Sequence, residues 1–258
     1  MLLSVITINY NDKEGLTRTM NSVLSQTYMD FEYIVIDGGS NDGSKAIIEQ
    51  QQDQLGYWVS EPDRGIYNAM NKGIAKANGE YILFLNSGDD LIGIDALQRV
   101  IVDLHSTDFV CYDINVVEAN HSYVKECPDQ LTFEYLSKDT PPHQSTFIKR
   151  KLFKTIGFYD ETLKIVSDWK FMIIAVCKYN CSYKHVGAMF SNFYRDGLSS
   201  VPENRQALHQ ERQGVLDSEF EVFMRDLGEK IRLRQALNHL KSSKKIQWLA
   251  KLGLLKNI

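Results

Sequence analysis

Carboxylates and amides follow three short apolar segments of the chain, at the point where each segment ends. The first two segments lead into Asn9 and Asp37, and the third into Asn86-Ser87-Gly88-Asp89-Asp90. Mg²⁺ and Mn²⁺ prefer hard oxygen ligands, and an ion held by one or two carboxylates keeps positions open for a diphosphate. The third motif therefore predicts a divalent-metal site with Asp89 and Asp90 as ligands. The alternative is a loop whose aspartates cap a helix that begins near Asp95.

The elements that must position these groups alternate between strand and helix. Strands are expected at residues 4–8, 33–36, 81–85, 109–112, 144–148 and 185–190, and helices at 16–24 (capped by Asp12), 44–50, 66–77 and 168–179. This order predicts an α/β fold with a mostly parallel central sheet and helices on both faces. Because ligands bind beyond the carboxyl ends of parallel strands, the polar groups should meet at one edge.

The second strand end carries a glycine-rich turn, Gly38-Gly39-Ser40. No Gly-Lys-Ser/Thr follows it and no GxGxxG is present, which excludes a Walker loop and disfavours a Rossmann dehydrogenase. Glycine lets the backbone approach a ligand closely, and a tight turn before a capped helix is the alternative. Asp37, at the end of an apolar strand, is suited to accept the imide N–H of a pyrimidine base.

The composition is that of a globular protein with an uneven distribution of charge. Of 258 residues, 43% are hydrophobic and 24% are charged, enough for one large domain. We expect a domain at residues 1–200, divided into halves at residue 100, and a helical tail at residues 201–258. The net charge of −4 indicates no nucleic-acid partner. Residues 229–258 carry eight basic residues and one acidic residue, so they are +7 and residues 1–228 are −11.

The basic tail has an apolar stripe at helical spacing. Leu233, Ala236, Leu237 and Leu240 form the stripe, and Trp248, Leu249, Leu252 and Leu255 continue it among lysines. A basic amphipathic helix favours an anionic membrane surface. The alternatives are a solvated face, or a helix that packs on the main domain or on a second copy of the chain in a homo-oligomer.

Four cysteines show neither a CxxC pair nor a dense framework. Cys177 and Cys181 lie four residues apart in an apolar helical stretch, where we expect buried free thiols. This pattern indicates a reducing compartment. The N-terminus lacks the basic flank and cleavage site of a signal peptide, and no apolar run reaches the roughly 20 residues that span a bilayer. We therefore expect a cytoplasmic protein, soluble or peripheral on the inner face of the plasma membrane.

Five motifs in this order and spacing resemble the family 2 glycosyltransferases, in a branch typical of bacterial capsule, O-antigen and colanic-acid clusters. They cover about residues 3–200. The motifs are Val5-Ile6-Thr7-Ile8-Asn9-Tyr10-Asn11, Val35-Ile36-Asp37-Gly38-Gly39-Ser40-Asn41-Asp42-Gly43-Ser44, Glu61-Pro62-Asp63-Arg64-Gly65-Ile66-Tyr67-Asn68-Ala69-Met70-Asn71-Lys72-Gly73-Ile74, Gly79-Glu80-Tyr81 and Phe84-Leu85-Asn86-Ser87-Gly88-Asp89. Further on, Pro142-His143-Gln144-Ser145-Thr146-Phe147-Ile148 and Ile156-Gly157-Phe158-Tyr159-Asp160-Glu161, leading to Ser167-Asp168-Trp169, resemble the second half of the family.

The resemblance implies the A-type glycosyltransferase fold, a nucleotide-diphospho-sugar donor (we expect a UDP-sugar) and inversion at the anomeric carbon. It places Tyr10 against the base and Asp37 in a hydrogen bond to it. The remaining residues that it assigns to donor binding are Thr7, Asp63, Arg64 and Asn71. Asp89 matches the last aspartate of the DXD region and would bind Mn²⁺ or Mg²⁺. Asn86 and Gly88 stand where aspartates are common, which puts the helper role of Asp90 in doubt.

The second half of the resemblance carries the reaction. Asp168 stands where the family has its general base, and a plain helix cap is the alternative. His143 is expected at the diphosphate or the metal, or as a structural histidine, whereas His185 is expected in the core. Arg195 lies in a late flexible loop and is expected to contact the donor phosphate.

The favoured function is transfer of a sugar to a hydroxyl of a growing cell-surface glycan, free or linked to polyprenyl diphosphate. A sugar-nucleotide pyrophosphorylase would need a Gly-rich loop with Arg or Lys after the first strand, where this chain has Tyr10-Asn11-Asp12. A catalytically inactive, transferase-like scaffold subunit should have lost Asp89 or Asp168, and both are present. The donor sugar, the acceptor and the linkage stay open.

Overall fold

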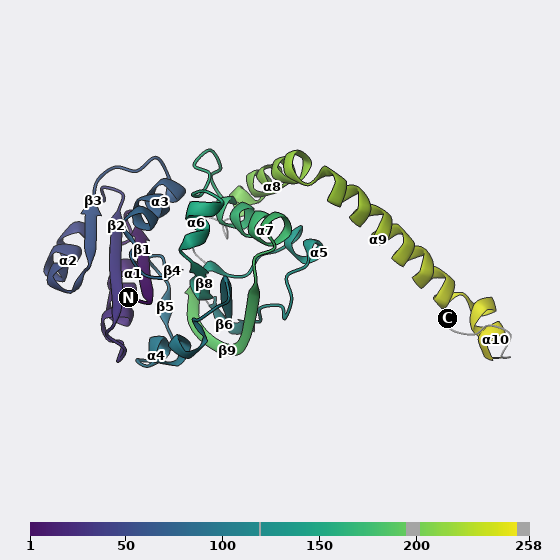
Figure 1. The fold of residues 1–258 in the computed structure, drawn as a ribbon, viewed down its shortest axis with the longest axis horizontal. Helices are drawn as coiled ribbons and strands as arrows, with labels where there is room; N and C mark the ends of the chain where they lie inside the picture. The colour runs from purple at the N-terminus through teal and green to yellow at the C-terminus, as the bar shows by residue number, and fades with distance from the viewer. Residues whose placement is uncertain (119, 195–201, 252–258) are drawn as a thin grey trace. The chain divides into compact units, whose positions relative to one another are not determined.

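The computed structural model describes residues 1–118, 120–194 and 202–251. The chain divides into two compact units, Met1–Glu211 and Arg212–Ile258. Within the described residues of the first unit, nine strands form one sheet in the order β3-β2-β1-β4-β8-β6-β9-β5, with β7 paired to β6 (Figure 1). The strands are β1 (Leu3–Asn9), β2 (Phe31–Asp37), β3 (Tyr57–Ser60), β4 (Tyr81–Phe84), β5 (Asp90–Leu91), β6 (Phe109–Val117), β7 (Ser122–Lys125), β8 (Thr146–Lys149) and β9 (Tyr183–Tyr194).

The helices of the first unit lie between these strands in the chain. They are α1 (Lys13–Leu24), α2 (Ser44–Gln50), α3 (Ile66–Lys76), α4 (Ala96–Val100), α5 (Phe133–Leu136), α6 (Lys151–Thr155) and α7 (Ser167–Tyr179), with short 3₁₀ turns η1 (Gln52–Gln54), η2 (Ile101–Asp103), η3 (His143–Ser145) and η4 (Pro202–Asn204). Asp12 caps α1, because its Oδ1 accepts the Gly15 N–H at 3.0 Å. The expected α/β fold with helices on both faces of a central sheet is confirmed.

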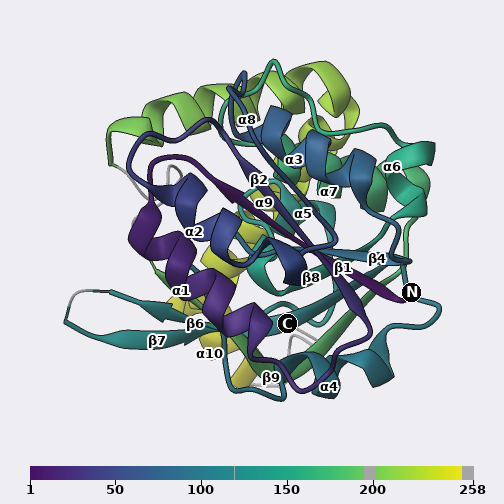
Figure 2. The ribbon, with the colours of Figure 1, turned by 90° about the vertical axis from the view of Figure 1, so that its left-hand side faces the viewer.

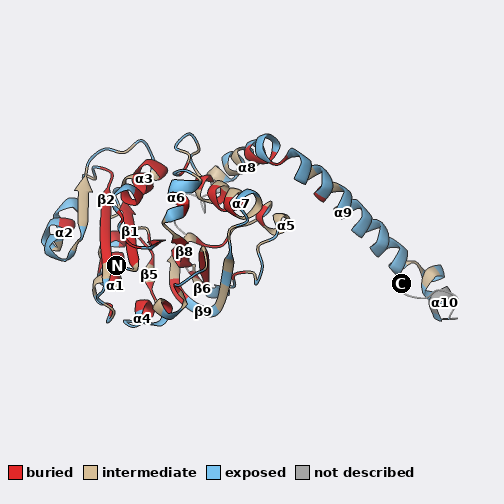
Figure 3. Ribbon diagram, viewed as in Figure 1, coloured by how far each residue is buried: buried red, intermediate tan, exposed pale blue. Residues whose placement is uncertain are grey.

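The first four strands of the sheet explain where the polar strand ends meet. β3, β2, β1 and β4 run parallel, and Asn9 of β1 lies in register with Asp37 of β2. Strands β1, β2 and β4 are buried along their length except Phe31 at the start of β2, as their near-continuous apolar sequences require (Figure 3). Their carboxyl ends therefore point to one edge.

Alternate side chains of β1 divide between two apolar layers. Leu3 and Val5 join the core formed with α1, α2 and α4, and α1 and α2 lie side by side over that face (Figure 2). Ile6 points to the other face, where α3 packs. A Cβ on Gly73 of α3 would lie 2.6 Å from Ile6 Cγ2, so only glycine permits this close approach.

The second half of the sheet is mixed rather than parallel. β8 runs antiparallel to both β4 and β6, and β5 runs antiparallel to β9. The extra strands β3, β5 and β7 were not expected from sequence, because β3 is only partly buried, β5 has two residues and β7 is mostly exposed. The expectation of a mostly parallel sheet therefore holds for the half that ends in the polar motifs.

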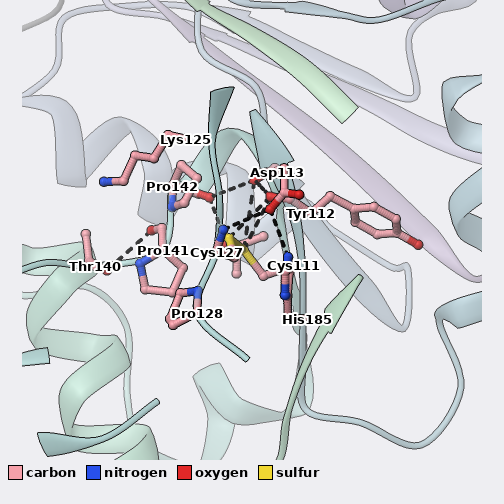
Figure 4. The surroundings of a disulfide bond; sticks show 12 residues. Cys111, Tyr112, Asp113, Lys125, Cys127, Pro128, Thr140, Pro141, Pro142 and His185 are labelled. Carbon is pink, nitrogen blue, oxygen red and sulfur yellow. Dashed lines mark hydrogen bonds and ion pairs between the residues drawn. A yellow bond between two sulfur atoms is a disulfide. The ribbon is translucent and has the colours of Figure 1, made fainter. Parts of the chain in front are cut away.

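The cysteines correct one expectation. Cys111 of β6 and Cys127, which follows β7, form a disulfide, whereas Cys177 and Cys181 are free thiols and half-buried. β7 runs back alongside β6, so the chain brings Cys127 beside Cys111. The spacing of the cysteines in the sequence did not predict this pair. Figure 4 shows the surroundings of this bond. The Cys111–Cys127 disulfide therefore removes the support that cysteine usage gave to the expectation of a reducing compartment.

The expectation that His185 belongs to the apolar core is wrong. Asp113 Oδ1 accepts the Cys127 N–H and faces His185 Nε2, both at 2.8 Å (Figure 4). Asp129 faces the other ring nitrogen of His185 at 2.9 Å. Burial lowers the pKa of His185, but these two carboxylates outweigh it and raise the pKa above its usual value. His185 therefore belongs to a charged cluster beside the disulfide.

The C-terminal segment is helical, as expected. Its helices are α8 (Arg205–Glu219), α9 (Glu221–Ser242) and α10 (Lys244–Lys251). The apolar stripe of α9 is exposed at Leu233, Leu237 and Leu240, and Trp248 of α10 is 62% exposed. Figure 3 shows α9 mostly in the colour of exposed residues. Leu252 and Leu255 lie outside the described residues. Within the described part of the chain, none of the helices combines the length and apolar composition needed to cross a bilayer.

Candidate active site

A cavity of about 1000 Å³ opens at the carboxyl ends of the parallel strands. Its wall comes from the turns after β1 and β2, the start of α3, the loop after β4, η3, the start of α7 and the end of β9. Five of the residues singled out from sequence line it: Tyr10, Asp63, Asp89, His143 and Asp168. Thr7, Asp37, Arg64, Asn71 and Asp90 do not, and Arg195 lies outside the described residues.

One end of the cavity presents an exposed aromatic ring. Tyr10 follows β1 directly and is 69% exposed. A Cβ on Gly38 would lie 3.1 Å from the Tyr10 ring and 2.9 Å from Asp63 Oδ2, so a side chain there would crowd both groups. Asp63 accepts a hydrogen bond from Lys72 Nζ at 2.6 Å, which fixes its carboxylate at the wall. The glycine-rich turn therefore keeps this end open to a flat ligand.

Asp37 is fully buried behind this rim. Its Oδ1 accepts from Asn9 Nδ2 at 2.7 Å and from Ser40 Oγ, and its Oδ2 accepts from Ser60 Oγ at 2.6 Å and from the Ser40 N–H at 3.0 Å. Burial raises the pKa of Asp37, but these donors outweigh it and hold the pKa below its usual value. The carboxylate thus holds three strand ends together as an ionised group.

Asp89 and Asn86 are the lining residues whose side-chain oxygens suit a cation. Asp89 is 5% exposed, and its Oδ1 accepts the Tyr194 N–H at 3.2 Å. Asn86 Oδ1 is buried without a hydrogen-bond partner among the described residues. No group of three or more His, Cys, Asp or Glu side chains that could hold a metal occurs in the described part of the chain. Any cation here would therefore be bound by few protein atoms.

Asp90 is turned away from the cavity. Its Oδ1 accepts from Asn192 Nδ2 at 2.6 Å and its Oδ2 from the Tyr194 hydroxyl at 3.3 Å. These bonds join β5 to β9, whose residues Asp90 and Asn192 are paired in the sheet. These bonds to β9 hold the Asp90 side chain away from the cavity that Asp89 lines. The structure does not bring Asp90 into the set of candidate metal ligands.

Asp168 lies in the first turn of α7, where Val166 is the N-cap residue. Its side chain is 25% exposed and lines the cavity. Oδ1 accepts from the Tyr67 hydroxyl at 2.8 Å, and Oδ2 is 3.8 Å from His143 Nδ1. The carboxylate is therefore not a plain helix cap: it faces the cavity with one oxygen restrained.

His143 connects the neighbourhoods of Asp168 and Asn86. Its Nε2 is 3.1 Å from Asn86 Nδ2. Burial lowers the pKa of His143 below its usual value, against the opposing effect of Asp168. Because an amide nitrogen can only donate, Nε2 of the neutral ring accepts and Nδ1 carries the proton toward Asp168. The histidine is a neutral polar link between two parts of the cavity wall.

Three residues that the sequence assigned to donor binding bond other parts of the protein instead of lining the cavity. Asn71 bonds the Tyr159 backbone through its Nδ2 at 2.9 Å and its Oδ1 at 3.0 Å. Arg64 pairs with Glu161 at 2.7 Å, and Asn71 also donates to Glu161 at 3.0 Å. Thr7 is buried and donates to the Leu85 carbonyl at 2.8 Å. Glu161 thereby ties the 61–71 motif to the 156–161 motif.

The structure adds cavity residues that sequence reasoning did not single out. Phe193 and Tyr194 reach it from the end of β9, and Lys164 and Ile165 from the loop before α7. Arg18 Cζ lies 3.9 Å from the centre of the Tyr194 ring, so α1 supports this side of the wall. The sequence held one clue to Tyr194, because it directly precedes Arg195, which we expected to contact the donor phosphate.

The cavity combines three chemical capacities. Its volume lies in the range of sites that enclose a sizeable small molecule. Asp89 and Asn86 offer oxygens to a divalent cation, and Asp168 offers a carboxylate oxygen that can take a proton. The residues described as lining the cavity include one lysine, Lys164, and four aspartates, Asp12, Asp63, Asp89 and Asp168. A highly anionic ligand would therefore need a cation with it.

Comparison with known proteins identifies the family of this chain and a relative in it. Residues 4–168 match the model of the family described as glycosyl transferase family 2. The chain is similar to an uncharacterized glycosyltransferase of Mycobacterium tuberculosis, with 37% identity over 183 residues that cover 68% of this chain and 70% of the relative.

Two solved structures have a similar fold. One is S. aureus TarS 1-349 in complex with UDP-GlcNAc, with a TM-score of 0.63, 21% identity and coverage of 76% of this chain and 59% of that one. The other is the mannosyltransferase PcManGT from Pyrobaculum calidifontis in complex with GDP-Man and Mn²⁺, with a TM-score of 0.59, 16% identity and coverage of 77% and 58%. This chain therefore spans less than two thirds of either structure.

Proposed function

The chain belongs to glycosyl transferase family 2, and from that premise we propose that it transfers a sugar from a nucleotide-diphospho-sugar to a hydroxyl group with inversion at the anomeric carbon. One observation carries this proposal: Asp89 and Asp168 line the same cavity at the carboxyl ends of the parallel strands, with Tyr10 on that wall. These three groups correspond to a metal and diphosphate position, a base for the acceptor, and a surface for the nucleobase.

The residues around Asp89 fit a divalent cation. The carboxylate of Asp89 and the unpartnered Oδ1 of Asn86 are hard oxygen donors on one wall. Mg²⁺ is commonly bound by one or two protein groups together with substrate phosphates, which suits a site with few protein ligands. When bound, the ion would neutralise the diphosphate and the charge that builds on the leaving nucleotide. The PcManGT complex contains Mn²⁺, which supports the same class of ion here.

We favour a UDP-sugar as donor, in keeping with the UDP-GlcNAc complex of TarS. The exposed ring of Tyr10 can stack on a base. Asp37 stays our candidate for the base N3–H, and this contact requires its Oδ2 to exchange the Ser60 hydroxyl for the base. Guanine presents a different edge to such a carboxylate, so GDP should bind more weakly.

Asp168 acts as the general base in this proposal. The acceptor hydroxyl approaches the anomeric carbon and its oxygen forms the new bond there. Its proton goes to Asp168, and the bond from the anomeric carbon to the diphosphate breaks, with the electron pair leaving on the nucleoside diphosphate. A single displacement of this kind needs one carboxylate and no covalent intermediate. The free oxygen Oδ2 of Asp168 is available for the proton.

Donor binding tests the first part of the proposal. We would titrate UDP, dTDP and GDP into the protein by calorimetry with and without Mn²⁺, using Asp89→Asn and the neighbouring Asp90→Asn as matched variants. Asp89→Asn should remove the Mn²⁺-dependent gain in UDP affinity, by about 10-fold or more, and Asp90→Asn should retain it. Unchanged affinity in Asp89→Asn would falsify the metal assignment. If GDP bound most tightly, the pyrimidine preference would be wrong.

For the acceptor, we propose a growing cell-surface glycan at an anionic membrane. The support is the +7 charge of residues 229–258 together with exposed leucines on α9 and an exposed Trp248. Each basic residue near an anionic surface contributes on the order of 1 kcal/mol, and apolar side chains can enter the interface. The attraction should weaken with salt, because the Debye length is about 8 Å at physiological ionic strength and shorter above it.

Vesicle sedimentation tests the membrane proposal on the full chain. The test variant replaces Lys241, Lys244 and Lys245 by Glu, and the control replaces three exposed lysines of the main unit, Lys45, Lys138 and Lys151. Wild type and control should sediment with phosphatidylglycerol vesicles at low salt and be released at high salt, whereas the test variant should stay in solution. Equal binding by all three proteins, or none by wild type, contradicts the proposal; the latter favours packing on a second copy, which light scattering would detect.

A further inference from the structure

The hydroxyl of Tyr67 is placed at the start of the helix that carries Asp168. Tyr67 comes from α3, is 4% exposed and also lines the cavity. Its hydroxyl donates to Asp168 Oδ1 at 2.8 Å. A hydrogen bond from a tyrosine of α3 therefore reaches the first turn of α7.

The phenol of Tyr67 is the donor of this hydrogen bond. A phenolic hydroxyl has one hydrogen to donate and two lone pairs that accept. The hydrogen bond to Asp168 Oδ1 uses that one hydrogen. Burial and the nearby Asp168 carboxylate hold the pKa of Tyr67 well above its usual value. The hydroxyl stays protonated and keeps donating across the pH range in which the protein would work.

The ring of Tyr67 is held as firmly as its hydroxyl. It packs edge-on against Tyr159, with ring centroids 5.7 Å apart, and Tyr159 in turn packs against Phe171 of α7 at 5.5 Å. The carboxylate on α7 and the phenol on α3 are thus joined through both a hydrogen bond and a shared aromatic cluster. The side chain of Asp168 cannot rotate about its own axis without losing the bond to Tyr67.

We propose that Tyr67 is the positioning residue of Asp168: it holds Oδ1, so that Oδ2 alone is presented to the acceptor hydroxyl. This inference rests on the proposed role of Asp168 as base and adds a residue to it. Tyr67 does not touch the reacting atoms; it acts through the carboxylate. His143 Nδ1, 3.8 Å from Oδ2, flanks the free oxygen without closing a hydrogen bond to it.

Tyr67→Phe tests the inference, because it removes the hydroxyl and keeps the ring that packs on Tyr159. The matched control is Tyr81→Phe, which removes a buried hydroxyl bonded to the His105 and Thr107 carbonyls. Tyr67→Phe should lower kcat by roughly 10- to 100-fold, the scale for losing an orienting contact. Its UDP affinity should stay within about 2-fold of wild type, since no donor contact is removed. Tyr81→Phe should change neither quantity, and thermal melting of both variants checks the fold.

A double-mutant cycle separates positioning from a purely structural effect. In an Asp168→Asn background, Tyr67→Phe should reduce the residual rate by less than about 2-fold, because its route of action is already gone. A full additional loss in that background would overturn the inference, as would a wild-type kcat for Tyr67→Phe alone. In the second case, an Asp168→Asn protein that still binds UDP and does not turn over would leave the proposed base in place. A fully active Asp168→Asn would remove both proposals together.

Discussion

The end of β2 and the start of α7 each carry a carboxylate toward the same edge of the sheet, and the structure treats them in opposite ways. Asp37 is fully buried and accepts four hydrogen bonds from Asn9, Ser40 and Ser60. Asp168 is a quarter exposed and, among the residues that the structure describes, accepts one hydrogen bond, from Tyr67. The Asp37 carboxylate is enclosed by protein donors, whereas Oδ2 of Asp168 faces the cavity and receives no hydrogen bond from the described residues.

The difference shows how a carboxylate at a strand or helix end can be assigned. A buried carboxylate whose oxygens are all occupied by protein donors stabilises the fold, because leaving those donors unpaired would be costly. A carboxylate with a free oxygen in a cavity can accept a proton or bind a ligand at little structural cost. The two positions are therefore expected to respond differently to the same Asp→Asn substitution.

The largest expected effect belongs to Asp168→Asn. The amide cannot take the acceptor proton, so kcat should fall by about 10²–10⁴-fold, while UDP affinity and the melting temperature stay close to wild type. Steady-state kinetics with a verified acceptor, together with calorimetry of UDP, would measure this. If transfer continued at a near-normal rate, Asp160 and Glu161 would become the candidates for the base.

Asp37→Asn should instead act on stability. An amide nitrogen in place of one carboxylate oxygen meets Ser40 and Ser60 donors, so about 1–3 kcal/mol of unfolding free energy should be lost. Urea unfolding followed by circular dichroism measures this, with Asp168→Asn as the comparison. Because Asp37 is also our candidate for the base N3–H, UDP affinity should fall in this variant together with stability. Weaker UDP binding with unchanged stability would erase the contrast between the two carboxylates.

The smallest effect is expected at Asp160, an ion-paired carboxylate outside the cavity. Burial raises its pKa, but Lys170 and Thr162 outweigh it and lower the pKa to about 2. The pKa of Asp160 is therefore lower in the folded protein than in the unfolded chain, so the ionised carboxyl and its pair with Lys170 stabilise the fold above about pH 4. This stabilisation is lost as the pH falls toward 2. Asp160→Asn should therefore cost about 1 kcal/mol at pH 7, allowing for partial exposure, and much less near pH 2, where the carboxyl is largely losing its charge. Equal losses at both pH values would contradict the assignment.

Much of the fold could be predicted from sequence wherever one element buries its own apolar pattern. The helix Ser44–Gln50 matches its expected bounds, and the strands at Leu3–Asn9 and Phe31–Asp37 extend the expected ones by one or two residues at each end. The strand Ser122–Lys125 was missed because its side chains are mostly exposed and leave no apolar pattern. The Cys111–Cys127 bond was missed because it depends on how β6 and β7 pair.

The candidate site was predictable by position more than by role. Asp89 and Asp168 were named from motifs, and the structure brings both to one cavity. Asp90, Asn71 and Thr7 were named in the same way, yet their side chains bond other parts of the protein. A motif contains the residues that touch a ligand together with those that hold them, and the spacing alone does not separate the two kinds.

What the sequence by itself determined is the set of chemical groups and the edge of the sheet at which they gather. Apolar runs define the parallel strands, and polar residues that follow those runs must lie at the carboxyl ends, because strand direction is set by chain order. Only the tertiary structure decided which groups stay free. That outcome depends on partners distant in the chain, such as Ser60 at Asp37 and Tyr67 at Asp168, since a hydrogen bond between side chains requires a distance and an angle that only packing establishes.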